Sequence, residues 1–281
     1  MKRNFRELLE NNKWLKKVPN ALTICNSLCG FAAILYTLQV YDSPKMPEDV
    51  LAVSAWIILF AMVFDALDGF TARLFNAASM HGLQMDSLSD MVAFGVAPAV
   101  IVAVMAHRMA AEMAPGKYVL IWAFCGIYLG CAASRLATYN VHAILEKKSG
   151  DKFTGLPSPG AAAAVCSLVI FYGMKDGEIK QIVSFLPVYA AVLGLLMISD
   201  IPYVHMGRWM LSVRRNRKRL FAVFISLICL YWQPELTMLL LINGYVLSGP
   251  LLLVAVRTGL LKPAPLLLEE QVPAACHPKH K

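Results

Sequence analysis

Four aspartates recur at spacings that place acidic side chains on one face of each of two helices. The first stripe follows i, i+3, i+4, i+7 and comprises Asp65, Asp68, Gly69 and Ala72. The second stripe follows i, i+4, i+8 and comprises Gly82, Asp86 and Asp90. A short connection separates the two helices, so we expect them to run antiparallel with the stripes facing each other. The small residues then leave room for a bulky group beside the acids.

Clustered carboxylates repel one another unless cations neutralise them. Oxygen ligands favour hard ions, so we expect Mg²⁺ or Mn²⁺ at Asp65, Asp68, Asp86 and Asp90. Two such ions suit a diphosphate, because they neutralise its charge and stabilise the leaving phosphate. The structural alternative is that the acids pair with Arg73 or nearby lysines and only hold two helices together. One arginine cannot balance four aspartates, which favours the metal site.

The elements that carry these acids belong to a membrane protein. Of the 281 residues, 58% are hydrophobic and only 16% are charged, which is too apolar for a soluble domain of this length. Lipid offers no partners for backbone polar groups, so the expected fold is all-α, a polytopic transmembrane helical bundle. A carboxylate at membrane depth costs several kcal/mol, so each aspartate there needs a partner or a function.

We expect about eight spans. They are Ala21–Val40, Leu51–Phe70, Ser89–His107, Tyr118–Leu136, Pro159–Met174, Ile182–Ile198, Leu220–Trp232 and Leu236–Val256. Six of these spans lie within residues 19–200, and residues 201–260 add a basic loop and two further spans. The seventh span is short, so it must tilt little, lie in thinned bilayer or be re-entrant.

Charge placement predicts the orientation of the chain. On one side lie 21 of the 26 Lys and Arg residues, which puts both termini in the cytoplasm of a multi-pass protein of the cell (inner) membrane. Residues 1–18 suit an amphipathic helix on the cytoplasmic surface, and residues 261–281 suit a disordered tail. The net charge of +8 indicates contact with anionic lipid headgroups. Nucleic-acid binding is disfavoured, because it needs a basic face with base-stacking aromatics.

The acidic pattern resembles a known family. The run Asp65-x-x-Asp68-Gly69-x-x-Ala72-Arg73, eight residues, then Gly82-x-x-x-Asp86-x-x-x-Asp90 resembles the signature of the CDP-alcohol phosphotransferases without departure. The resemblance implies a six-helix core, a cytoplasm-facing site for two metals, and a homodimer. It also assigns roles by position: Asp65, Asp68 and Asp86 as metal ligands, Asp90 as ligand and general base, Gly69, Ala72 and Gly82 as space for the CDP group, and Arg73 as an aid to the phosphates or the helix contact.

Other segments resemble the phosphatidylserine synthase branch of that family. They are Pro19–Thr23, Asp86–Pro98, Arg135-Leu136-Ala137 with Asn140, and Gly155–Pro159. This resemblance implies that the hydroxyl of L-serine attacks the β-phosphorus of CDP-diacylglycerol and releases CMP, with Asp90 taking the hydroxyl proton. It also places Asn20 and Thr23 at the cytidine pocket, although both also suit a helix entry.

Serine needs a cation for its carboxylate and hydrogen-bonding groups near the metals. Arg135 is the candidate for the carboxylate. Asn140, Ser87 and Ser158 are candidates for further hydrogen bonds, and each equally suits a helix end or a turn. The alternative acceptors within the family are glycerol phosphate, inositol phosphate and choline. A phosphate-bearing acceptor needs a basic cluster, which Lys147, Lys148 and Lys152 could form.

Two further classes use acidic residues in membranes. A prenyltransferase also binds a diphosphate through Mg²⁺ and aspartate-rich helices, but its two acidic motifs lie in well-separated parts of the chain. A secondary transporter binds ions near the midplane and has halves with matching interrupted helices. The four aspartates lie toward one membrane face and no such halves are evident, so phosphotransfer is favoured.

Overall fold

The part of the chain that the computed structural model describes is helical. It comprises residues 17–42, 47–75, 79–110, 117–145, 155–174, 180–201, 203 and 217–258, and no strand occurs among them. The all-α prediction is therefore confirmed. The predicted surface helix up to residue 16, the lysines at 147, 148 and 152, most of the basic loop and the tail 261–281 lie outside the described residues.

The helices fall at the positions expected for the spans. In chain order they are α2 (Val18–Leu38), α3 (Pro47–Leu74), α4 (Met80–Asp90), α5 (Ala97–Ala110), α6 (Lys117–Leu145), α7 (Ser158–Met174), α8 (Lys180–Met197), α10 (Arg217–Trp232) and α11 (Pro234–Arg257). A 3₁₀ turn, η2 (Gln39–Tyr41), follows α2, and a π-helix, η3 (Met91–Val96), joins α4 to α5. Five helical stretches among the described residues are long and apolar enough to cross a bilayer, and three shorter apolar helices accompany them.

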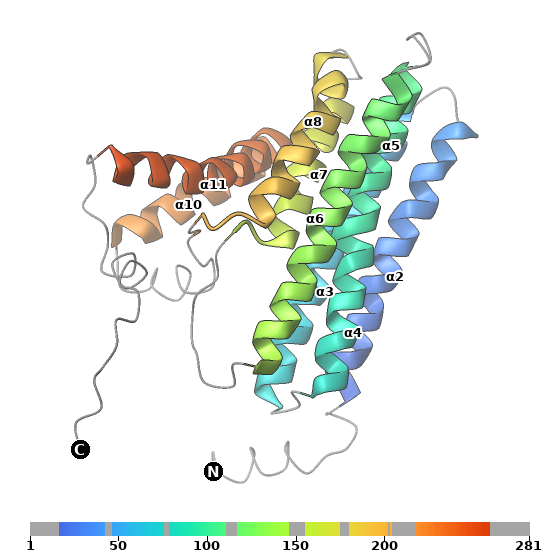
Figure 1. Cartoon of the computed structure of the whole chain (residues 1–281). Helices are drawn as coiled ribbons and strands as arrows, with labels where there is room; N and C mark the ends of the chain where they lie inside the picture. The colour runs from blue at the N-terminus through green and yellow to red at the C-terminus, as the bar shows by residue number, and fades with distance from the viewer. Residues whose placement is uncertain are drawn as a thin grey trace, which may run out of the picture.

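Helices α2 to α8 lie side by side as one bundle (Figure 1). The main packing pairs are α2 with α3, α3 with α7, and α6 with α8. Ile58, Phe94 and Tyr128 are fully buried between them, whereas large apolar side chains such as Phe60 and Trp122 are exposed on the outside. Exposed apolar side chains all around a bundle suit a hydrocarbon environment, where burial gains nothing further. The polytopic membrane bundle is thus the fold of the chain.

Helices α10 and α11 run across the bundle at a steep angle instead of along it (Figure 1). Asn243 of α11 donates from Nδ2 to Ser167 Oγ of α7 at 3.2 Å and accepts a hydrogen bond from the Tyr189 hydroxyl of α8. Tyr203 donates from its hydroxyl to the Val246 carbonyl oxygen at 3.0 Å. These polar contacts dock α11 on the core. The helices expected at the seventh and eighth spans are present, and their crossing of the membrane stays a prediction.

The turn before α7 is fixed by backbone hydrogen bonds to the segment after α8. The Gly155 N–H donates to the Ile201 carbonyl oxygen at 2.9 Å, and the Leu156 N–H donates to the Leu196 carbonyl oxygen at 3.0 Å. Gly155 has a φ of 81°, and a Cβ there would collide with the Met197 carbonyl oxygen, so only glycine fits. These contacts hold the turn that leads into α7 and so fix where that helix begins.

Candidate metal centre

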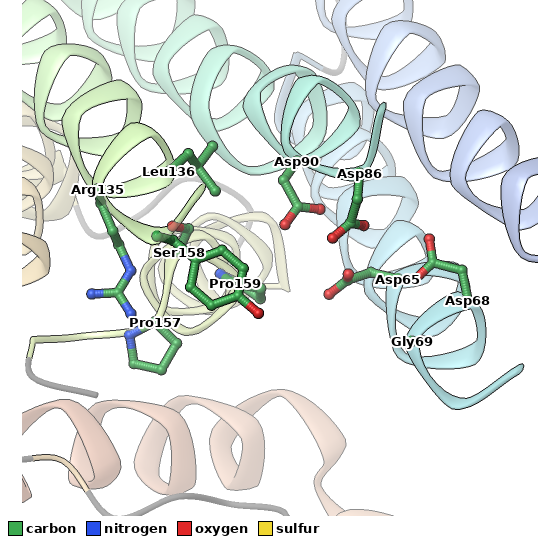
Figure 2. Close-up of a pocket in the computed structure, with 11 residues that line it drawn as sticks. Asp65, Asp68, Gly69, Asp86, Asp90, Arg135, Leu136, Pro157, Ser158 and Pro159 are labelled. Carbon is green, nitrogen blue, oxygen red and sulfur yellow. The ribbon is translucent and has the colours of Figure 1, made fainter. Parts of the chain in front are cut away.

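Helices α3 and α4 bring the four aspartates together at one end of the bundle. Carboxylate oxygens of Asp65, Asp68 and Asp86 lie within 4.8 Å of one another. Asp90 lines the same cavity, and Figure 2 shows the carboxylates of both helices turned toward a common region. The two acidic stripes expected from the helical spacing thus face each other. The roles of the individual aspartates as ligands stay predictions.

Helix α2 lies against these acids and contributes polar side chains to them. Thr23 donates from Oγ1 to Asp68 Oδ2 at 2.9 Å. Asn26 donates from Nδ2 to Asp90 Oδ1 at 3.1 Å. Ser89 of α4 donates from Oγ to the Thr23 carbonyl oxygen at 2.8 Å. These contacts join α2, α3 and α4 around the carboxylates.

The donor atoms of the cluster fit a divalent cation. All are carboxylate oxygens, the ligands that Mg²⁺ and Mn²⁺ prefer. Among the described residues, Asp86 Oδ1 is buried without a hydrogen-bond partner, although buried polar atoms are nearly always bonded. The exposed Arg73 donates from Nε to the Gly69 carbonyl oxygen at 2.9 Å, so its bonded partner is the backbone of its own helix. That contact disfavours the structural alternative in which Arg73 pairs with the acids.

A cavity of about 300 Å³ lies between the acids and the start of α7. It is lined by Asp65, Asp68, Gly69, Asp86, Asp90, Arg135, Leu136, Tyr139, Pro157, Ser158 and Pro159. Figure 2 shows Arg135 and Ser158 on the side opposite the four carboxylates. The first N–H groups of a helix have no acceptor within it and carry the positive end of the helix dipole. The cavity therefore has an acidic wall and an electropositive wall.

Arg135 is held in a defined position on the electropositive wall. One guanidinium nitrogen, Nη1, donates to the Met197 carbonyl oxygen at the end of α8, at 2.8 Å. The same nitrogen lies about 3.0 Å from where a Cβ on Gly155 would sit, so the glycine also makes room for the guanidinium. Arg135 thus ties α6 to α8 while it lines the cavity.

The π-helix η3 begins directly after Asp90. The fully buried Tyr128 of α6 donates from its hydroxyl to the Phe94 carbonyl oxygen at 2.8 Å. Gly30 of α2 approaches the same segment so closely that a Cβ there would lie 2.7 Å from Ala93 Cα. A π-turn inserts a residue into a helix and is frequent at functional sites. Here it lets Asp90 face the acids while α5 keeps its apolar side chains in the core.

Of the residues predicted to accommodate the CDP group, Gly69 lines the cavity and the others do not. Gly69 lines the cavity, and no atom lies within 4 Å of the position that its Cβ would occupy. Gly82 lies near Asn20, whose Oδ1 is 3.5 Å from the corresponding Cβ position. Ala72 and Arg73 lie on α3 beyond the residues that line the cavity. The space beside Gly69 is therefore the clearest room for a ligand.

Two of the predicted acceptor-binding residues bind each other. Ser87 Oγ lies 2.8 Å from Asn140 Oδ1, to which it donates. This contact joins α4 to α6, and neither residue lines the cavity. Ser158 and Arg135 do line it. The structure therefore brings two of the four predicted acceptor residues to the cavity and places the other two behind it.

Two residues that the sequence did not suggest belong to the site. Tyr139 lines the cavity one helical turn after Arg135. Residues at this spacing share a helix face, so the sequence could have suggested Tyr139 once Arg135 was chosen. Asn26 reaches Asp90 from α2, and nothing in the local sequence pairs these two residues, because they are far apart in the chain. Asn26 therefore required the three-dimensional structure.

A model of the CDP-alcohol phosphatidyltransferase family matches residues 16–197, which include both acidic stripes and all of the helices α2 to α8. The chain belongs to the CDP-alcohol phosphatidyltransferase family. The resemblance seen in the spacing of the aspartates is thereby confirmed. Membership makes the chain a membrane-bound transferase, and it places the facing carboxylates in the matched part of the chain.

Curated relatives of this phosphatidyltransferase include enzymes named for serine. It is 26% identical to the CDP-diacylglycerol–serine O-phosphatidyltransferase of Helicobacter pylori, over 82% of this chain and 88% of that protein. It is 32% identical to the archaetidylserine synthase of Methanothermobacter thermautotrophicus, over 66% and 69% of the two chains. A Saccharomyces cerevisiae enzyme with the same name as the first is 35% identical, over 58% and 56%. No solved structure gave a significant match.

Proposed function

We propose that this CDP-alcohol phosphatidyltransferase transfers the phosphatidyl group of CDP-diacylglycerol to L-serine and releases CMP. The observation that carries the proposal is one cavity in which four carboxylates face Arg135 and the start of α7. A nucleotide diphosphate needs cations at its phosphates, and an amino acid needs a cation at its carboxylate. The names of the relatives from Helicobacter and Saccharomyces support serine as the acceptor.

The proposed metal ligands are Asp65, Asp68, Asp86 and Asp90, for two Mg²⁺ or Mn²⁺ ions. Bound ions would neutralise the diphosphate and stabilise the departing CMP. The short distances among three of the carboxylates and the unpartnered Asp86 oxygen support this assignment. Gly69 leaves space for the CDP group beside the acids. Ala72, Arg73, Gly82 and Asn20 are also proposed for that group, and they lie outside the set of residues that line the cavity. Thr23, also proposed for that pocket, contacts Asp68.

On the opposite wall, Arg135 and the N–H groups of Ser158 and Gly160 at the start of α7 bind the serine carboxylate. Pro159 has no N–H, and the Ala161 N–H donates to the Pro157 carbonyl oxygen. The buried Ser158 offers a hydroxyl at the same place. Ser87 and Asn140 act from behind the cavity, because their mutual contact holds α4 against α6. The serine hydroxyl then lies between this wall and the acids, where it can attack the β-phosphorus.

Asp90 is the proposed general base, since it lines the cavity and has one oxygen engaged by Asn26. Its other oxygen has two lone pairs, so it can both ligate an ion and receive the proton of the serine hydroxyl. An Asp90→Asn variant keeps the shape of the side chain and removes its basicity. We expect a large loss of kcat and a changed pH dependence of the remaining rate. An unchanged pH–rate profile in a variant that still turns over would exclude this role.

The acceptor is tested by product analysis. Purified protein is incubated with CDP-diacylglycerol, Mg²⁺ or Mn²⁺, and labelled serine, glycerol phosphate, inositol phosphate or choline in turn. We expect lipid product from serine only. Arg135→Gln should raise the KM for serine more than tenfold with a smaller change in the KM for CDP-diacylglycerol, and Arg108→Gln, on the far end of α5, serves as the control. A lipid formed from another acceptor, and none from serine, would contradict the proposal.

We extend the proposal to the whole chain as follows. The protein lies in the cell (inner) membrane with both termini in the cytoplasm, and it forms a homodimer among membrane lipids. Residues 1–18 form the surface helix, 19–200 the catalytic core, 201–260 the basic loop and two further spans, and 261–281 the tail. The end of the family match at residue 197 supports the core boundary.

A further inference from the structure

One face of α2 carries polar side chains that are buried against the acid cluster. Thr23 is 4% exposed and Asn26 is fully buried. They are spaced i and i+3, so they lie on the same side of the helix, and Gly30 continues that face where α2 touches η3. The polar face of α2 therefore lies against α3 and α4, the two helices that carry the acids.

Each of these side chains contacts one oxygen of one carboxylate. Thr23 Oγ1 lies 2.9 Å from Asp68 Oδ2, and it also lies 3.0 Å from the Pro19 carbonyl oxygen one turn earlier. Asn26 contacts Asp90 through Nδ2, which can only donate, so the amide holds Asp90 Oδ1 as an acceptor. No described residue donates a hydrogen bond to the other oxygen of Asp90, which is left for another partner.

The cost of burying Asn26 indicates that its amide has a function. Its Oδ1 is buried and has no hydrogen-bond partner among the described residues. A leucine would fill a site in this bundle without burying an unbonded polar oxygen. Packing alone therefore does not explain an asparagine here, whereas a fixed donor to Asp90 does.

We propose that Thr23 and Asn26 are positioning residues that select which oxygen of Asp68 and of Asp90 is presented to the metal ions. This inference rests on the proposed metal site and deepens it. Partners behind the ligands of a metal site fix ligand orientation, and losing one typically weakens metal binding about 10- to 100-fold. By this account α2, which carries no acid of the cluster, sets its geometry.

The chain offers matched variants for a test. Thr23→Val removes the hydroxyl and keeps the shape, whereas Thr23→Ser keeps the hydroxyl. Thr37→Val is the control, because Thr37 is on α2, is fully buried, and donates only to the Ala33 carbonyl oxygen of its own helix. Asn26→Leu removes the donor to Asp90.

The readout is Mn²⁺ binding to the purified full chain without substrates, measured by the electron paramagnetic resonance signal of free Mn²⁺. We expect Thr23→Val and Asn26→Leu to weaken binding about 10- to 100-fold, and Thr23→Ser and Thr37→Val to match the wild type. Melting temperatures show which variants are folded, and Thr23→Ser gives the comparison if Thr23→Val is not. The half-saturating Mn²⁺ concentration for activity should move in parallel, with little change in the KM for serine.

The outcomes separate the two proposals. If the wild type binds Mn²⁺ and folded Thr23→Val and Asn26→Leu bind it as tightly as Thr37→Val, the positioning role is wrong and the metal site stands. If the wild type binds no Mn²⁺ with or without CDP-diacylglycerol, the proposed metal site itself is wrong. Weaker binding in both variants, with Thr23→Ser like the wild type, supports the positioning role.

Discussion

Asp86 shows why the acid cluster is better explained by a ligand than by helix contacts. Its Oδ1 is buried without a partner among the described residues, and its neighbours Asp65 and Asp68 are acids as well. In a bundle surrounded by lipid, such an arrangement is costly unless a cation completes it. The sequence alone predicted the four acids and their facing stripes, because helical spacing determines which side chains share a face.

Replacing Asp86 with asparagine should abolish most of the activity. Asp86→Asn keeps the size of the side chain but removes one charge from the cluster, so we expect kcat/KM to fall about 10²-fold or more. Asp42→Asn is the matched control, because Asp42 is exposed at the opposite end of α2. Initial rates of CMP release at saturating metal provide the measurement. Activity within about twofold of the wild type in Asp86→Asn would argue that this carboxylate is not a ligand.

Hydropathy located the apolar helices, and the spacing of Gly82, Asp86 and Asp90 located α4, but neither revealed how the backbones meet. The sequence predicted one span over Ser89–His107, and it gave no sign of the π-helix η3 within it. That segment depends on contacts from Tyr128 of α6 and Gly30 of α2, which are distant in sequence. Periodicity reports which face of a helix is apolar, and it does not report an inserted residue.

The contact between α2 and η3 gives a stability prediction. A Cβ at Gly30 would lie 2.7 Å from Ala93 Cα, so Gly30→Ala should force the two backbones apart at a cost of about 1–3 kcal/mol. Gly126→Ala on α6 is the control, because nothing lies within 4 Å of its Cβ position. Melting temperatures in detergent should fall for Gly30→Ala only, and its activity should fall with the displaced Asp90. Equal melting temperatures for the two variants would show that α2 does not touch η3 this closely.

Helix α11 should be held on the core by its buried polar contacts. Asn243→Leu removes hydrogen bonds to Ser167 and Tyr189, and we expect a loss of about 0.6–2 kcal/mol. Ser248→Ala is the control, since Ser248 donates only to the Tyr245 carbonyl oxygen of its own helix. Thermal unfolding in detergent compares them. If Asn243→Leu is as stable as Ser248→Ala, these contacts do not dock α11.

For the whole molecule, the sequence predicted a membrane helical bundle, but not the direction of α10 and α11. The apolar length of a segment shows whether it can cross a bilayer, and its tilt depends on packing against neighbours. Here that packing comes from Asn243 and Tyr203, whose partners lie on other parts of the chain. Charge asymmetry still assigns a side of the membrane to each loop.

Cysteine labelling of intact cells tests that assignment. A cysteine introduced at residue 113 or 177, in a variant whose native cysteines are replaced, should react with a reagent that cannot cross the inner membrane. One at residue 149 or 212 should react only after the cells are opened. Labelling of residue 149 from outside would reverse the orientation and place the acid cluster on the wrong side for a cytosolic nucleotide product.

We propose that the facing carboxylates bind divalent cations and that these cations make the phosphatidyl transfer possible. CMP release from CDP-diacylglycerol by purified protein tests this, with serine and the divalent cation each supplied or withheld. We expect CMP only when both are present, in an amount equal to the phosphatidylserine formed, and almost none from Asp86→Asn. Equal CMP release after removal of all divalent cations would contradict it.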